Sequence, residues 1–242
     1  MIARQILASG GLWLNLNGTE MLVDPGPGCI VQVNKLKLDP ENLSAILLSH
    51  RHLDHSADTN IMVEAMTAGG TKPHGWLFAP TDALANEPVI YSYLRKYLDG
   101  VHLFEGGQTY NVNGVSFATP VRHVHTVETY GISFTSGDIR FAYIADSRYF
   151  EALSQNYRGN KVLIINVVMV ERTVPVDHLD TGDAAQIIAA IKPEVAILTH
   201  FGMNMWRANP VEVADRISQQ TGVRVIAARD GMKFNLADLT CE

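Results

Sequence analysis

The feature that most constrains this 242-residue chain is the segment Leu48-Ser49-His50-Arg51-His52-Leu53-Asp54-His55. It follows a nearly all-apolar run, which predicts a buried strand. In an extended segment His50 and His52 point to the same side, because successive side chains alternate. Asp54 and His55 come where the backbone turns and a helix can begin, so they can face a second point. Three imidazoles and one carboxylate in this spacing indicate a binuclear metal site.

The composition limits the partners of the chain. The formal net charge is −6 and the sequence contains no Lys/Arg-rich run, which disfavours a large nucleic acid as partner. A small phosphorylated substrate remains compatible, because bound metal cations supply local positive charge. The sequence also lacks a secretory signal and an apolar stretch of membrane-spanning length. We therefore expect a cytoplasmic protein without a membrane partner that acts on a small molecule, and a homo-oligomer remains open.

The pattern of elements predicts one α/β domain over residues 1–242. Asn17-Gly18 and Asn113-Gly114 indicate hairpin turns in the first half. Helical spacing predicts helices over Ser56–Ala68 and Val89–Leu98. The last third alternates buried strands with helices, in the style of βαβ units. There we expect a helix over Thr181–Ile191 with Thr181 as N-cap, and another that begins at Asn209-Pro210 and closes at Gly222.

Several predicted strands end in residues that can bind metal, as His50 and its neighbours do. Asp24 follows one strand, and it is either a cap or a partner that orients a metal ligand; the nearby histidine cluster favours the second. His123 or His125, Asp146 and His200 follow other strands. Two metal sites can be assembled from these residues: His50, His52 and one of His123/His125 in the first, Asp54, His55 and His200 in the second, with Asp146 as a bridge. Two further histidines, His74 and His102, are expected to be surface or packing residues.

These motifs together resemble the metallo-β-lactamase superfamily of binuclear metallohydrolases, and the resemblance covers nearly the whole chain. The matched motifs are Val23-Asp24-Pro25-Gly26, His50-x-His52-x-Asp54-His55, the third-motif histidine, Tyr143-Ile144-Ala145-Asp146-Ser147 and Leu198-Thr199-His200-Phe201. The resemblance implies an α/β fold, a four-layer αββα sandwich with mixed sheets, helices on the outer faces and the metals at one edge between the sheets.

Within that superfamily the chain resembles the phosphodiesterase branch, which includes tRNase Z. The spacing from His125 to Tyr130-Gly131 is similar to the branch's third motif, which implies His125 rather than His123 as the ligand. His178-Leu179-Asp180-Thr181 resembles the branch's accessory histidine, which contacts the scissile phosphate and assists protonation of the leaving group. Two departures stand out. Ile165-Asn166-Val167-Val168 replaces a His-Glu-Ala-Thr-like run, so no acid there orients His178, although Glu171 lies slightly later. The glycine-rich arm of tRNase Z is also missing.

The expected function is therefore a binuclear metal-dependent hydrolase that cleaves a small phosphodiester through a metal-bridging hydroxide. Asp54 is expected to steer the nucleophile and His178 to act on the leaving-group side. The expected cofactors are two divalent metal ions, Zn²⁺ first, with Mn²⁺ or Fe as alternatives. Two other functions stay open: hydrolysis of a thioester or lactone on the same fold, and a non-hydrolytic di-iron protein that handles oxygen or senses redox state.

Overall fold

The chain forms two compact units in the computed structural model, which describes residues 5–85 and 87–241. The boundary lies between Ser116 and Phe117. Both units combine strands with helices that pack on them. The α/β class predicted from the sequence is therefore confirmed.

The first unit is built on a five-stranded sheet with the order β1-β2-β3-β4-β5. The pair β1/β2 is antiparallel, and the pairs from β2 to β5 are parallel. Asn17 and Gly18 form the turn of the β1/β2 hairpin with φ of 54° and 85°, the left-handed values that a type I′ turn requires. The strands of this unit are β1 (Leu12–Leu16), β2 (Thr19–Val23), β3 (Leu43–Leu47), β4 (Trp76–Ala79), β5 (Gly100–Leu103) and β6 (Gln108–Val112).

Helices cover this sheet through one apolar core. Val33 of α1 (Cys29–Lys35) and Met62 and Met66 of α3 (Thr59–Met66) are buried together with Leu22 and Ile46 of the strands. Burial of such side chains is the main favourable contribution to folding. The other helices of the unit are short: the 3₁₀ helix η2 (Pro40–Asn42), α2 (Leu53–Ser56), α4 (Thr81–Leu84) and α5 (Ser92–Arg95).

Two predicted helices are shorter in the structure, where contacts with other segments hold residues near their predicted starts. The predicted helix Ser56–Ala68 is shortened to α3. Ser56 ends the separate turn α2, and the Asp58 N–H between the two helices donates to the Pro25 carbonyl at 2.9 Å. The predicted helix Val89–Leu98 is reduced to the single turn α5. There the Tyr91 N–H donates to the Asn60 side chain at 2.9 Å. Neither partner is visible in a local sequence pattern.

The second unit contains a mixed sheet in which β12, β11, β10, β9 and β8 follow one another. β9 to β12 are parallel, whereas β8 and β9 form an antiparallel hairpin. Asn113 and Gly114, with φ of 50° and 86°, form the predicted turn between β6 and β7 at the boundary of the units. The strands are β7 (Val115–Thr119), β8 (Ile132–Ser136), β9 (Ile139–Ile144), β10 (Val162–Asn166), β11 (Val195–Thr199) and β12 (Arg224–Ala227), followed by the small pair β13 (Phe234–Asn235) and β14 (Thr240–Cys241).

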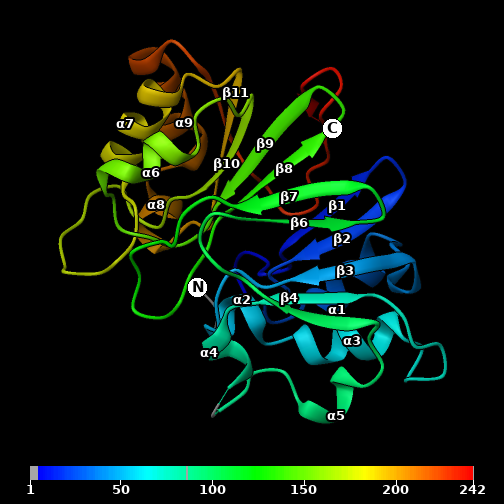
Figure 1. Cartoon of the computed structure of the whole chain (residues 1–242). Coiled ribbons are helices and arrows are strands. Elements are labelled where there is room, and N and C mark those ends of the chain that lie inside the picture. The colour runs from blue at the N-terminus through cyan, green and yellow to red at the C-terminus, as the bar shows by residue number, and fades with distance from the viewer. Residues whose placement is uncertain (1–4, 86, 242) are drawn as a thin grey trace. The chain divides into compact units, whose positions relative to one another are not determined.

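Helices of the second unit gather beside β9–β11, as Figure 1 shows for α6, α7 and α9. α9 has the predicted ends, with Asn209 as N-cap, Pro210 at the first position and Gly222 in the left-handed conformation. The predicted N-cap of α7 is wrong by one residue: Asp180 caps the helix, and the Thr181 hydroxyl donates to the Val170 carbonyl instead. The helices are α6 (Glu151–Asn156), α7 (Thr181–Ile191), α8 (Met203–Arg207) and α9 (Pro210–Thr221).

The helices of the chain are short. Within residues 5–85 and 87–241, none combines the length and the apolar character needed to cross a membrane. The longest of them, α9, has 12 residues.

Gly26 in the motif after β2 offers a test of local packing. A Cβ atom at this position would lie 2.0 Å from the Asp54 carbonyl oxygen and 2.5 Å from that of Ser9. We expect Gly26→Ala to lower the free energy of unfolding by about 1–3 kcal/mol, because backbone atoms must shift to admit the methyl group. Urea denaturation followed by circular dichroism measures this change. Gly10→Ala is the control, since its Cβ would meet only ordinary contacts at 3.5 Å; equal stability loss in both variants would contradict the explanation.

Candidate metal centre

Asp24 organises the histidine cluster of the first unit. Its side chain is buried and accepts three hydrogen bonds: from the Ser49 N–H at 2.6 Å, from the Ser49 hydroxyl at 2.6 Å and from His55 Nδ1 at 2.9 Å. Its φ of 53° lies in the left-handed region, which costs about 1–2 kcal/mol for a non-glycine residue. The contact with His55 agrees with the prediction that Asp24 orients a metal ligand.

These contacts determine which ring nitrogen of each histidine carries the proton. The Ser49 hydroxyl has one hydrogen, and it donates this hydrogen in a bond to the Asp24 carboxylate, which can only accept. The Ser49 oxygen, 2.9 Å from His50 Nδ1, must then accept a hydrogen bond from the Nδ1–H group of that ring. His55 Nδ1 likewise donates to Asp24. Both imidazoles therefore have their lone pair on Nε2, the form in which a neutral histidine binds a metal ion.

The other ligand candidates of this unit lie beside these two rings. The ring centroids of His50 and His52 are 4.8 Å apart, and those of His50 and His55 are 4.1 Å apart. Asp54 Oδ2 lies 3.9 Å from His55 Nε2. The structure thus brings together all four metal-ligand candidates of the His50–His55 segment, with His50 and His55 buried and His52 and Asp54 partly exposed.

Asp146, at the end of β9 in the second unit, is buried and held by an amide. Asn166 Nδ2 donates to Asp146 Oδ1 at 2.8 Å and to the Tyr143 hydroxyl oxygen at 3.0 Å. The other oxygen, Oδ2, lies 3.4 Å from His178 Nδ1 and 3.9 Å from His200 Nε2. The Asn166 contact therefore leaves Oδ2 as the atom that faces the two histidines.

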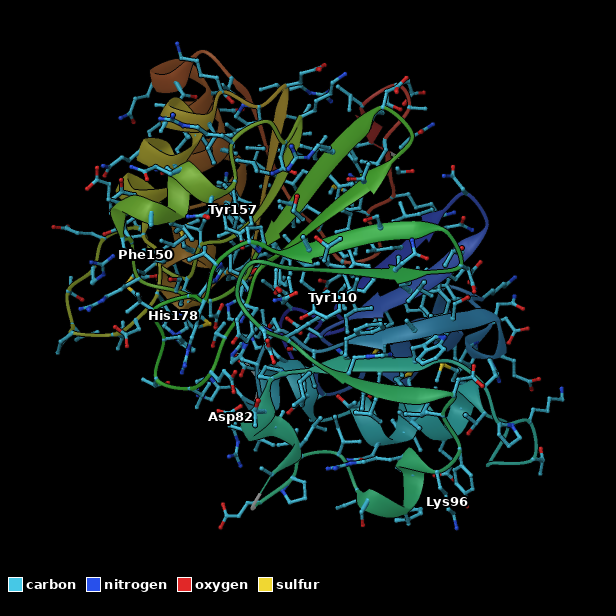
Figure 2. All side chains as sticks on the ribbon, viewed as in Figure 1. Asp82, Lys96, Tyr110, Phe150, Tyr157 and His178 are labelled. Atoms are coloured by element: carbon cyan, nitrogen blue, oxygen red, sulfur yellow. The ribbon has the colours of Figure 1, made fainter. Side chains whose placement is uncertain are left out.

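His125 and His178 are positioned by one stretch of backbone. His125 Nδ1 lies 2.8 Å from the Asp177 carbonyl oxygen, which can only accept, so the lone pair of His125 is on Nε2. The next residue is His178, whose ring centroid lies 5.1 Å from that of His125 and 6.3 Å from that of His200. Figure 2 labels His178 on the segment before α7. Each of the predicted site residues of the second unit is thus part of one cluster.

His200 follows the last residue of β11 and has a φ of 61°. Backbone strain of this kind persists where surrounding contacts hold it and is frequent at functional sites. Here Gly202, two residues later, donates its N–H to the Val168 carbonyl at 2.9 Å. A Cβ on Gly202 would lie 2.4 Å from that same oxygen, so the close approach requires glycine.

His123, the alternative to His125, is a buried neighbour with its own partners. Its Nδ1 lies 3.3 Å from the Asp146 carbonyl oxygen and its Nε2 lies 2.9 Å from the Tyr157 hydroxyl. Burial lowers the pKa of His123 to about 4 and raises the pKa of Tyr157. His123 is therefore neutral at pH 7, and the Tyr157 hydroxyl donates to its Nε2. Figure 2 labels Tyr157 at the end of α6.

The donor atoms of both units suit divalent metal ions. Asp24, His50 and His55 form one group of potential ligand atoms within 4.8 Å of one another, and His125, Asp146 and His178 form another. In the first group Asp24 already accepts three hydrogen bonds, so we assign it to orienting rather than binding. Imidazole nitrogens with carboxylate oxygens are the ligand set of zinc and of related transition metals, so the residues present fit such ions.

Sequence reasoning missed two residues that support the cluster. Ser49 orients His50, but a serine before a histidine carries no distinctive signal. Asn166 is neutral and lies where the related motif has an acid, but it ends β10, as Asp24 and Asp146 follow β2 and β9. The strand-end position was the signal that could have found it.

The two remaining histidines are outside the cluster, as predicted. His74 contacts the backbone carbonyls of Lys72 and Glu41. The His102 ring packs on Trp76 and Phe78 with centroid distances of 5.2 Å and 5.0 Å.

Comparison with known proteins identifies the superfamily of this chain. Residues 19–201 match the family described as "Beta-lactamase superfamily domain", and the chain belongs to this superfamily. It is 34% identical to Uncharacterized protein MJ1374 of Methanocaldococcus jannaschii over 241 residues, which cover 95% of this chain and 88% of the relative. Membership and the His/Asp clusters together identify a metal-dependent hydrolase of the metallo-β-lactamase superfamily.

Solved structures confirm the fold predicted from the sequence. The metallo-β-lactamase fold protein YhfI from Bacillus subtilis is similar with a TM-score of 0.77 and 19% identity, covering 90% of this chain and 88% of that one. A diphosphatase from the PhnP family has a TM-score of 0.68 and 20% identity, with 93% and 83% covered. Human tRNase Z, short form, has a TM-score of 0.64 and 15% identity, with 93% and 91% covered.

The Ser49 contact leads to a prediction about metal affinity. Ser49→Ala removes the oxygen that accepts from His50 Nδ1 and one donor to Asp24. We expect metal affinity to fall by roughly 10- to 100-fold, the usual effect of losing a group that orients a ligand. Competition with a chromogenic chelator measures the affinity. Ser44→Ala is the control, because Ser44 contacts Asn113 and none of the site residues in the described part of the chain; unchanged affinity in Ser49→Ala would refute the orienting role.

The Asn166 contact leads to a second prediction. Asn166→Leu removes the amide that holds Asp146 Oδ1 and leaves a buried carboxylate oxygen without this donor. We expect weaker metal binding by roughly 10- to 100-fold, together with a lower midpoint of thermal unfolding. Asn166→Asp places a second carboxylate beside Asp146 and should also weaken the metal-free fold, because like charges repel. Wild-type metal affinity in both variants would show that Asp146 is held by other contacts.

Proposed function

We propose that this chain is a phosphodiesterase that uses two divalent metal ions, Zn²⁺ first, to cleave a small phosphodiester. The observation that carries the proposal is the position of His178, with Nδ1 3.4 Å from the Asp146 carboxylate and a partly exposed ring. In sequence, this histidine resembles the accessory histidine of the phosphodiesterase branch. The similarity to a diphosphatase of the PhnP family supports phosphorus-centred chemistry.

The proposed ligands are those predicted from the sequence motifs. His50, His52 and His125 would hold one metal ion, Asp54, His55 and His200 the other, and Asp146 would bridge them. The contacts within each unit support this set, because His50, His55 and His125 all donate through Nδ1. We retain the prediction that residues 1–242 act as one domain.

The residues of the chain would contribute to the reaction in distinct ways. Two bound divalent ions would supply a nucleophile at neutral pH and stabilise negative charge on substrate oxygens. Asp54, partly exposed beside His55, can accept a hydrogen bond and so orient the attacking group. His178 is partly exposed, and an imidazole ring can carry a proton on either nitrogen. It can therefore hold a proton for the leaving-group oxygen.

Metal content and model substrates test the proposal together. We expect about two zinc or manganese ions per chain in the purified protein, cleavage of bis-p-nitrophenyl phosphate that stops with chelator, and no turnover of a p-nitrophenyl ester or thioester. Ester or thioester turnover alone would favour the lactone or thioester hydrolase. Two irons without any hydrolysis would favour the non-hydrolytic di-iron protein.

Substitutions separate the ligand roles from the proton-transfer role. His52→Ala and Asp146→Ala should abolish cleavage in a folded protein. His178→Gln should reduce kcat by roughly 10²- to 10⁴-fold, the range for a general acid, with metal content unchanged. His102→Gln is the control, since His102 is exposed and packs on Phe78. Loss of metal in His178→Gln would make His178 a ligand, which its place in a potential metal group would then explain.

A further inference from the structure

The segment that carries His178 has no regular secondary structure of its own. Residues 171–179 lie between the end of β10 and the start of α7, and Val174 and Val176 are exposed. A backbone of this kind has many accessible conformations unless specific contacts hold it. Two catalytically important groups of the proposed function nevertheless depend on it: the Asp177 carbonyl, which orients His125, and the His178 ring.

The side chain of Arg172 ties this segment to the start of α7. Arg172 Nη2 donates to the His178 carbonyl oxygen at 3.2 Å and forms an ion pair with the Asp183 carboxylate. The Arg172 N–H also donates to Asp180 Oδ2 at 3.1 Å. Arg172 and Asp183 are both largely shielded from water, with 31% and 17% of the side chain exposed, so the ion pair is less weakened by solvent than a surface pair.

The residues that receive these bonds are themselves fixed. Asp180 and Asp183 form a reciprocal capping box, in which Asp183 N–H donates to Asp180 Oδ1 at 2.9 Å and Asp180 N–H to Asp183 Oδ2 at 3.3 Å. Leu179, between His178 and the cap, is buried, and its carbonyl accepts from Val168 N–H at 3.2 Å. The guanidinium thus connects the His178 backbone to an 11-residue helix.

We propose that Arg172 is the positioning residue for His178, fixing its backbone through the His178 carbonyl while the Asp183 ion pair fixes the guanidinium. This inference rests on the proposed function. The segment Ile165-Asn166-Val167-Val168 supplies no acid to orient His178. In this chain the basic residue Arg172 bonds instead to the main-chain carbonyl of His178. The planar guanidinium suits this role because it can bond two acceptors in fixed directions.

The substitution Arg172→Gln tests the proposal, because glutamine is neutral and shorter and cannot hold both partners. We expect kcat for bis-p-nitrophenyl phosphate to fall by roughly 10- to 100-fold, as a displaced catalytic group would cause, with KM and metal content near wild type. The limb of the kcat–pH profile that disappears in His178→Gln should shift or flatten in Arg172→Gln. Arg172→Lys should recover part of kcat, since the ammonium group can pair with Asp183 but does not hold two N–H groups in the fixed directions of the guanidinium.

Hydrogen–deuterium exchange provides a readout that does not depend on activity. Amides of residues 176–180 should exchange faster in Arg172→Gln, while those of β11 stay protected. Arg216→Gln is the matched control: it removes an exposed arginine on α9 and should change neither exchange nor kcat.

The outcomes separate this inference from the proposed function. If wild-type protein cleaves no phosphodiester, the proposed function fails, and exchange alone decides whether Arg172 holds the segment. If wild-type protein cleaves and Arg172→Gln has unchanged kcat or unchanged exchange, the positioning role is refuted. Loss of metal together with kcat would also refute it, since the effect would then act on the ligands. If Arg172→Gln fails to fold, the same comparisons are made with Arg172→Lys.

Discussion

The site depends on one kind of interaction, a hydrogen bond from imidazole Nδ1 to an oxygen atom beside the ring. Ser49 accepts from His50, Asp24 from His55 and the Asp177 carbonyl from His125. A neutral imidazole has one N–H, so each of these bonds leaves the lone pair on Nε2. Ring direction and ligand atom are thereby set before any metal binds, which reduces the reorganisation that binding requires.

Two buried carboxylates at strand ends serve different purposes because their surroundings differ. Asp24 accepts three hydrogen bonds from Ser49 and His55, so its oxygens are used to orient other groups. Asp146 receives an amide from Asn166 on Oδ1, and its Oδ2 faces His178 and His200. Both acids follow a strand in the sequence, and in the structure the number and placement of their hydrogen-bond donors distinguish the orienting acid from the candidate ligand.

Local patterns predicted those elements whose structure depends on near neighbours. The Asn17-Gly18 and Asn113-Gly114 turns formed as expected because left-handed φ values are intrinsic to these residue types. The ends of α9 were also predicted, since Asn209 and Pro210 act on the first turn of the helix and Gly222 on its last turn. Predictions failed where distant groups hold the start of a helix. The Asp58 N–H bonds to the Pro25 carbonyl, and the N–H of Tyr91, the N-cap of α5, bonds to the Asn60 side chain.

The sequence by itself determined the class of the protein and the inventory of donor residues, because ligand spacing and strand-end positions are local properties that a chain displays directly. It also placed the candidate acid His178 next to its helix. Tertiary structure alone decided which nitrogen of His50, His55 and His125 carries the proton, and that Asn166 and Arg172 hold Asp146 and His178. Apart from the bond between the neighbours Ser49 and His50, which itself depends on Asp24, these contacts join residues between 6 and 52 positions apart in sequence. Their geometry follows from how strands and loops pack, which no local pattern encodes.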